Sequence, residues 1–183
     1  DHYHAFYHPG LWASGGGWGG AEDPRTVTAD DKVYLLFTLF QGWNSARVAL
    51  TSLHLSDFAR RDWRWKKAAL LSPPDEVHKN WLLFPEKIKG RYVVLHSITP
   101  KVAVHYVDDL SEFDNEDVFI QGSGRSGGRV THWDKQVRGA GAPPIKTEEG
   151  WLLLYHAVDP EHHNGYNVGV MLLDLEDPTR VRY

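Results

Sequence analysis

One pattern occurs three times along this chain: a proline, a short polar turn, an apolar run and then a second apolar run. The first runs cover residues 32–40, 91–97 and 150–156, and the second runs cover residues 47–53, 101–107 and 167–173. They are rich in β-branched and aromatic residues and are bounded by Gly, Pro or Asp, whereas a helical period is absent. The sequence therefore predicts an all-β protein built from repeated units.

The length of the repeat favours a β-propeller, with residues 1–183 as a single domain. The leading prolines stand about 60 residues apart, which is compatible with four strands and generous loops in each unit. In a propeller the sheets pack face to face, and loops at one end converge on a central funnel. A β-sandwich has similar short strands but does not require the repeat, so it is the alternative. Because a closed propeller needs about four blades or more, the ends supply partial blades or the chain is part of a longer protein.

Composition excludes several classes of function. The net charge of −4 predicts no broad basic face for nucleic acid. The basic, aromatic segment at residues 60–67 is expected to form a solvated outer edge of a blade. No apolar stretch is long enough to span a membrane, and the first residues lack the pattern of a signal peptide. The absence of cysteine excludes disulfides and thiol nucleophiles, and it favours a cytoplasmic location.

One feature of the sequence indicates catalysis, and another favours a carbohydrate site. Residues 20–25, with the sequence GAEDPR, place two acids, a rigid proline and an Arg before the run at 32–40. Acids held at the mouth of a strand can donate or accept protons. Aromatic residues make up 13% of the chain, and many stand beside Gly or polar residues. Such a mixture suits a site where rings stack on a sugar, although most single aromatics are expected in the core.

Six motifs together resemble a known family. In order they are GAEDPR at 20–25, Arg47 in a strand that ends in LTS, KNWLLFPEKIKGRYVVLH at 79–96, GAGAPPIKT at 139–147, GWLLLYH at 150–156 and LDLEDP at 173–178. The combination is similar to glycoside hydrolase family 130, the β-mannoside phosphorylases and related β-mannosidases. Members of that family are five-bladed β-propellers. The resemblance thus implies a five-bladed fold of which about three blades are visible in this chain.

The resemblance implies an inverting phosphorolysis of a β-mannoside oligosaccharide that releases α-mannose 1-phosphate. Asp23 matches the catalytic acid of the family, which protonates the glycosidic oxygen through a sugar hydroxyl while phosphate attacks C1 from the opposite face. Inorganic phosphate is then a co-substrate, and no other cofactor is implied. No metal site is expected, because the histidines at 2–8 stand at a chain end that is expected to be mobile and those at 162–163 have no partnered carboxylate at ligand spacing.

Binding of phosphate calls for cationic side chains that converge on one face. The positions that resemble the phosphate-contacting set of the family are Arg47, Lys79 and His156. Ser97 stands where phosphorylases commonly carry an Arg, and Arg138 is a further candidate that would partly compensate. Taken alone, each of these cations is better explained as a solvated charge at a strand edge, and only their joint position within the family pattern makes a phosphate site an equal alternative.

The expected contacts with the sugar come from Glu22, Arg25 and Asp159. The alternative for Glu22 is a structural role. The alternative for Asp159 is a turn that it forms with the proline that follows it. Asp159 resembles a residue that binds mannose hydroxyls at the non-reducing end.

Three other functions stay open at this point. Hydrolysis by the same family would need a second carboxylate as base, and the candidates are Glu86, Asp134 and Glu161. A carbohydrate-binding propeller without turnover would keep the aromatics and Asp159, and a scaffold would keep the strands alone. A homo-oligomer that covers an open sheet edge is a further hypothesis.

Overall fold

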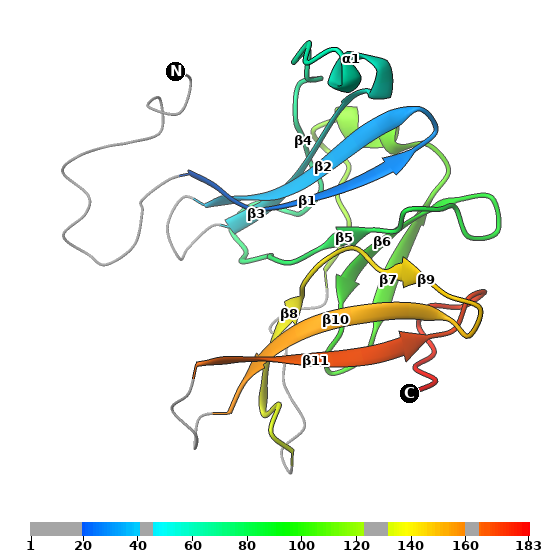
Figure 1. Ribbon diagram of the computed structural model, residues 1–183. Helices are drawn as coiled ribbons and strands as arrows, with labels where there is room; N and C mark the ends of the chain where they lie inside the picture. The colour runs from blue at the N-terminus through cyan, green and yellow to red at the C-terminus, as the bar shows by residue number, and fades with distance from the viewer. Residues whose placement is uncertain (1–19, 41–45, 123–131, 160–164) are drawn as a thin grey trace.

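The computed structural model describes residues 20–40, 46–122, 132–159 and 165–183 (Figure 1). Within these ranges the chain forms eleven strands in three antiparallel sheets and only two short helices. The all-β prediction is therefore confirmed. No helix in the described ranges is long and apolar enough to cross a membrane.

The three sheets follow one another along the chain (Figure 1). The first, in blue and cyan, contains β1 (Gly20–Ala29), β2 (Lys32–Phe40), β3 (Ala46–His54) and β4 (Ala69–Leu70). The second, in green, contains β5 (Leu82–Leu83), β6 (Tyr92–Ser97) and β7 (Ala103–Val107). The third, in yellow to red, contains β8 (Gln136–Ala140), β9 (Ile145–Lys146), β10 (Trp151–Val158) and β11 (Tyr166–Leu173). In each sheet the first strand in sequence is paired with one of the two long strands: β1 with β2, β5 with β6, and β8 with β10.

All six predicted apolar runs are strands, and each pair forms a hairpin: β2 with β3, β6 with β7, and β10 with β11. The segments that follow the first two hairpins form short helices, namely α1 (Leu55–Ala59) and the 3₁₀ helix η3 (Leu110–Asp114). Asp109 caps η3 by accepting a hydrogen bond from the Ser111 backbone N–H at 2.9 Å, while Glu112 accepts one from the Asp109 N–H at 3.2 Å. This reciprocal capping satisfies two backbone donors that a short helix leaves open.

The core consists of two clusters, and the second sheet contributes to both. Successive side chains of a strand point to opposite faces, so Tyr92 and Val94 of β6 enter the cluster shared with the first sheet. Val93 and Leu95 enter the cluster shared with the third sheet. The second sheet is thus buried on both faces, which explains why β6 has a continuous rather than an alternating apolar sequence.

The segment at residues 60–67 contains no strand, although its tryptophans alternate. It runs along β3, where the Lys66 N–H donates to the Ser52 carbonyl at 2.8 Å and the Thr51 hydroxyl donates to the Lys66 carbonyl at 2.5 Å. Trp63 is 56% exposed, and Lys66 pairs with Asp114. These charges are solvated along the edge of the first sheet, in agreement with the expected location.

Stability should fall as the pH falls from about 6.5 to about 4, in part because of His96 on β6. The imidazole packs edge-on against Trp81 at 5.7 Å, and its Nδ1 has no hydrogen-bond partner. Burial, with smaller contributions from His105 and His78, lowers the pKa of His96 from 6.5 to about 4. The unfolded chain therefore binds a proton at a pH where the folded chain does not, and acidification favours unfolding.

The measurement is urea unfolding between pH 4.5 and 7.5 of the wild type and of His96→Gln, which keeps a side-chain donor without an ionisable ring. The slope of stability against pH should be smaller in the variant. Parallel slopes would show that His96 does not contribute to the acid sensitivity.

Candidate active site

The acidic segment of residues 20–25 lies within β1, rather than before the first strand as the sequence indicated. The pairing of β1 with β2 shifts between Glu22, opposite Thr38, and Arg25, opposite Leu36, so β1 holds one extra residue there. Asp23 has a φ of 53°, in the left-handed region that Asp tolerates better than most residues. Pro24 has no N–H for the ladder. A β-bulge therefore forms at this point, and it presents Asp23 to solvent.

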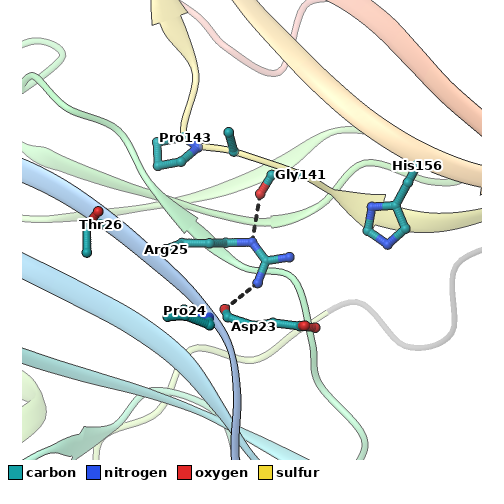
Figure 2. Close-up of a pocket in the computed structure, with 8 residues that line it drawn as sticks. Asp23, Pro24, Arg25, Thr26, Gly141, Pro143 and His156 are labelled. Carbon is teal, nitrogen blue, oxygen red and sulfur yellow. Dashed lines mark hydrogen bonds between the residues drawn. The ribbon is translucent and has the colours of Figure 1, made fainter.

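A pocket of about 460 Å³ opens beside this bulge (Figure 2). It is lined by Asp23, Pro24, Arg25, Thr26, Gly141, Ala142, Pro143 and His156. One wall comes from β1 of the first sheet. The other wall comes from the loop after β8 and from β10, both of the third sheet. Three of the predicted site residues, the acid Asp23, Arg25 and the phosphate candidate His156, thus line one pocket.

Arg25 joins the two walls (Figure 2). Its Nε donates to the Gly141 carbonyl at 2.7 Å, and its Nη1 donates to the Asp23 carbonyl at 2.6 Å. Its Nη2 donates to Asn80 Oδ1 at 2.7 Å and to the Ala140 carbonyl at 3.2 Å. The guanidinium group is therefore bound to the bulge, to the segment before β5 and to the end of β8.

His156 is the one imidazole among the described residues that line the pocket. Burial lowers the pKa of its imidazole, the nearby charges of Arg25 and Arg138 lower it further, and Asp23 acts in the opposite direction. The ring also packs edge-on against Tyr166 at 5.4 Å between centroids. At neutral pH the imidazole is consequently uncharged, with one N–H to donate and one nitrogen to accept.

Comparison with known proteins identifies the family. The model of glycoside hydrolase family 130, described as beta-1,4-mannooligosaccharide phosphorylase, matches residues 10–183. This chain belongs to glycoside hydrolase family 130. It is 38% identical over 165 residues to a 1,2-beta-oligomannan phosphorylase of Thermoanaerobacter sp. (strain X514), a match that covers 88% of this chain and 50% of that protein. It is also 37% identical over 164 residues to a beta-1,2-mannobiose phosphorylase of the same organism, covering 88% of this chain and 49% of the relative.

A solved structure of the family has a similar fold. The beta-1,2-mannobiose phosphorylase from Listeria innocua, in complex with beta-1,2-mannobiose, matches with a TM-score of 0.62 and 30% sequence identity. The match covers 88% of this chain and 43% of the Listeria innocua chain. This family 130 chain spans about half the length of the curated relatives that it matches.

Two of the cations expected at the phosphate lie outside the pocket lining of this family 130 member. Lys79 Nζ lies 3.2 Å from Glu22 Oε2 and above the Phe40 ring at 5.5 Å. Arg47 donates from Nε and Nη2 to the Ser72 carbonyl, at 2.9 and 2.5 Å. The structure therefore pairs Lys79 with the predicted sugar ligand Glu22 and places Arg47 in a separate contact; their roles stay predictions.

Arg138 and Asp159 are not among the residues that line the pocket. The Arg138 carbonyl, on β8, accepts a hydrogen bond from Asn80 Nδ2 at 2.8 Å, and its charge is one of those that lower the pKa of His156. Asp159 directly follows β10 and is only 7% exposed. Lys135 Nζ lies 3.7 Å from its carboxylate.

The candidate bases for a hydrolase do not line this pocket in the described part of the chain. Glu86 pairs with Lys146 at 2.5 Å. Asp134 is 2% exposed and accepts a hydrogen bond from the Tyr155 hydroxyl at 2.8 Å. Glu161 and the His-rich segments at 2–8 and 162–163 lie outside the described residues.

Asn80 is the residue of the site that the sequence did not reveal. Its φ of 61° is left-handed, a conformation that Asn adopts more easily than most residues. The available signal was an Asn between Lys79 and Trp81 in an otherwise apolar segment. Its partners Arg25 and Arg138 are 55 and 58 residues away in sequence, so no local pattern could assign them.

Proposed function

We propose that this protein catalyses the inverting phosphorolysis of β-mannosides and releases α-mannose 1-phosphate. The observation that carries the proposal is the β-bulge that presents Asp23 in a pocket shared with His156, in a chain of family 130. In this reaction the bond from C1 to the glycosidic oxygen breaks, and a bond from C1 to a phosphate oxygen forms. Asp23 supplies the proton that the leaving oxygen takes up, by way of a sugar hydroxyl.

Phosphate is proposed to bind at the His156 side of the pocket. An uncharged imidazole can donate one hydrogen bond to a phosphate oxygen, and Arg138 adds positive charge close enough to lower the pKa of His156. Arg47 and Lys79 are proposed as further phosphate ligands. Lys79 would have to exchange its contact with Glu22 for one with phosphate.

The mannosyl group is proposed to be held by carboxylates, since their oxygens accept hydrogen bonds from sugar hydroxyls. Asp159 is the first candidate, because it is nearly buried at the end of β10, the strand that carries His156. Glu22 is the second, adjacent to Asp23. The two relatives at 38% and 37% identity are named for β-1,2-linked mannosides. Mannosides with this linkage are therefore proposed as the preferred substrates.

The three sheets are proposed to be consecutive blades of a five-bladed propeller. Arg25 and Asn80 connect three segments: β1, the segment directly before β5, and β8. The strands β1, β5 and β8 are the first strands of the three sheets. The third sheet is apolar on both faces: Trp151 and Leu153 enter the core, while Leu154 faces outward beside its partner Val170, which is 51% exposed. A blade with a neighbour on each face requires such a sheet.

Hydrolysis is the second candidate, because Ser97 stands at the position of an expected Arg. The Ser97 hydroxyl donates to the Thr99 carbonyl at 2.9 Å and supplies no charge. Against hydrolysis, the described candidates for a base are engaged elsewhere, Glu86 with Lys146 and Asp134 with Tyr155.

The test is to incubate the purified protein with β-1,2-mannobiose or β-1,4-mannobiose, with and without phosphate, and to assay mannose 1-phosphate and mannose. We expect mannose 1-phosphate in the presence of phosphate and no product in its absence. Free mannose without phosphate would instead establish the hydrolase. If neither product forms while mannobiose raises the melting temperature, the protein is a carbohydrate-binding module.

A further inference from the structure

The hydrogen bonds of Arg25 indicate that its side chain binds other parts of the protein beside the pocket and does not bind the sugar. A guanidinium group has five N–H donors. Four of them are used within the protein, one on Nε, one on Nη1 and two on Nη2. Three of the four acceptors are backbone carbonyls. An arginine bound in this way has little capacity left for a ligand.

Asn80 completes the connection because both ends of its amide are occupied. Its Oδ1 accepts from Arg25 at 2.7 Å, and its Nδ2 donates to the Arg138 carbonyl at 2.8 Å. Gly139 leaves room for this amide, because a Cβ added there would lie 2.6 Å from the Cβ and the Nδ2 of Asn80. The amide therefore lies between β8 and the guanidinium group of β1.

The bulge depends on the same contacts. Asp23 needs a left-handed backbone to face the pocket, and the Arg25 bond to its carbonyl holds that backbone in place. The bond from Arg25 to the Gly141 carbonyl then determines how far the bulge lies from the opposite wall. One side chain thus controls both the direction of the acid and the width of the pocket.

We propose that Arg25 and Asn80 are a pair of positioning residues that place Asp23 against the Gly141 wall, and that Arg25 acts through the Asp23 backbone rather than by contact with the sugar. This inference rests on the proposed function, since it concerns the acid of that reaction. Lysine cannot replace Arg25, because an ammonium group is a point charge and cannot reach carbonyls on three segments at once.

The experiment compares kcat and KM for mannobiose phosphorolysis in Arg25→Lys, Asn80→Ala and the double variant. Misplacing an acid by about 1 Å can cost about 100-fold in rate. We therefore expect kcat to fall about 100-fold in Arg25→Lys with KM nearly unchanged, and the double variant to be no slower than Arg25→Lys. A rise in KM with kcat retained, or effects that multiply in the double variant, would show that Arg25 binds substrate and would overturn the inference.

Gly139→Ala tests the pair without removing a polar group, since the new methyl group displaces the Asn80 amide. It should lower kcat in the same way. The matched control is Gly90→Ala, which also has a positive φ, of 78°, but whose Cβ meets nothing within 4 Å. Equal kcat in the two glycine variants would contradict the role of Arg25 and Asn80 as positioning residues.

An inactive wild type would overturn the proposed function and the inference together. An active wild type whose variants change only in KM would overturn the inference alone.

Discussion

Asp23→Asn should slow the release of mannose 1-phosphate by about 10²- to 10⁴-fold, the contribution expected of a general acid. The N–H groups of the amide are too weakly acidic to protonate the leaving oxygen, whereas the volume of the side chain stays nearly the same. Asn also tolerates the left-handed backbone that Asp23 requires, with its φ of 53°. The bulge and the pocket should therefore persist, and the measurement is kcat together with the melting temperature.

The matched control is Asp31→Asn. Asp31 is exposed, lies in the turn between β1 and β2, and also has a left-handed backbone, with a φ of 57°. It should keep wild-type activity and stability. A similar loss of activity in both variants would indicate a general effect of removing a carboxylate. Full activity in Asp23→Asn would show that Asp23 is not the catalytic acid.

Trp151→Ala should lower the free energy of unfolding by about 3 to 5 kcal/mol, the usual cost of removing a buried Trp. Trp151 is 1% exposed and lies in the core cluster between the second and third sheets. Its ring meets Phe84 edge-on at 5.2 Å, and its Nε1 donates to the Leu175 carbonyl at 3.2 Å. The substitution leaves both a cavity and an unpaired carbonyl. Urea unfolding measures the effect.

Trp63→Ala is the control for this loss, because it removes the same side chain from the surface. Trp63 is 56% exposed and contacts Phe58 edge-on. Its removal should change the free energy of unfolding by no more than about 0.5 kcal/mol. Comparable losses in the two variants would refute the location of the core between the sheets.

The longer strands could be predicted because their sequences carry the signal locally. The run at 150–156 includes the first six of the eight residues of β10, and the pattern of buried and half-buried residues in this strand alternates as a strand requires. Strands of two residues, such as β5 and β9, are too short to produce a pattern. β1 was missed for another reason: a proline within a strand argues against the strand, and only pairing with β2 reveals the bulge that accommodates Pro24.

The site could be predicted only in part. The acid Asp23 and the phosphate candidate His156 were both predicted site residues, and the structure places them in one pocket. For Arg25 the sequence predicted a contact with the sugar, but the direction of a long side chain depends on segments that fold against it. The acceptors at Gly141 and Asn80 are 116 and 55 residues away in sequence. Residues with such long-range partners are the ones that motifs leave unassigned.

The most direct test of the account is to follow the reaction of the protein with β-1,2-mannobiose and phosphate by proton and phosphorus NMR, and to identify the first sugar product. The account predicts α-mannose 1-phosphate, formed only when phosphate is present and absent in Asp23→Asn. β-Mannose 1-phosphate as the first product, or free mannose formed without phosphate, would contradict it.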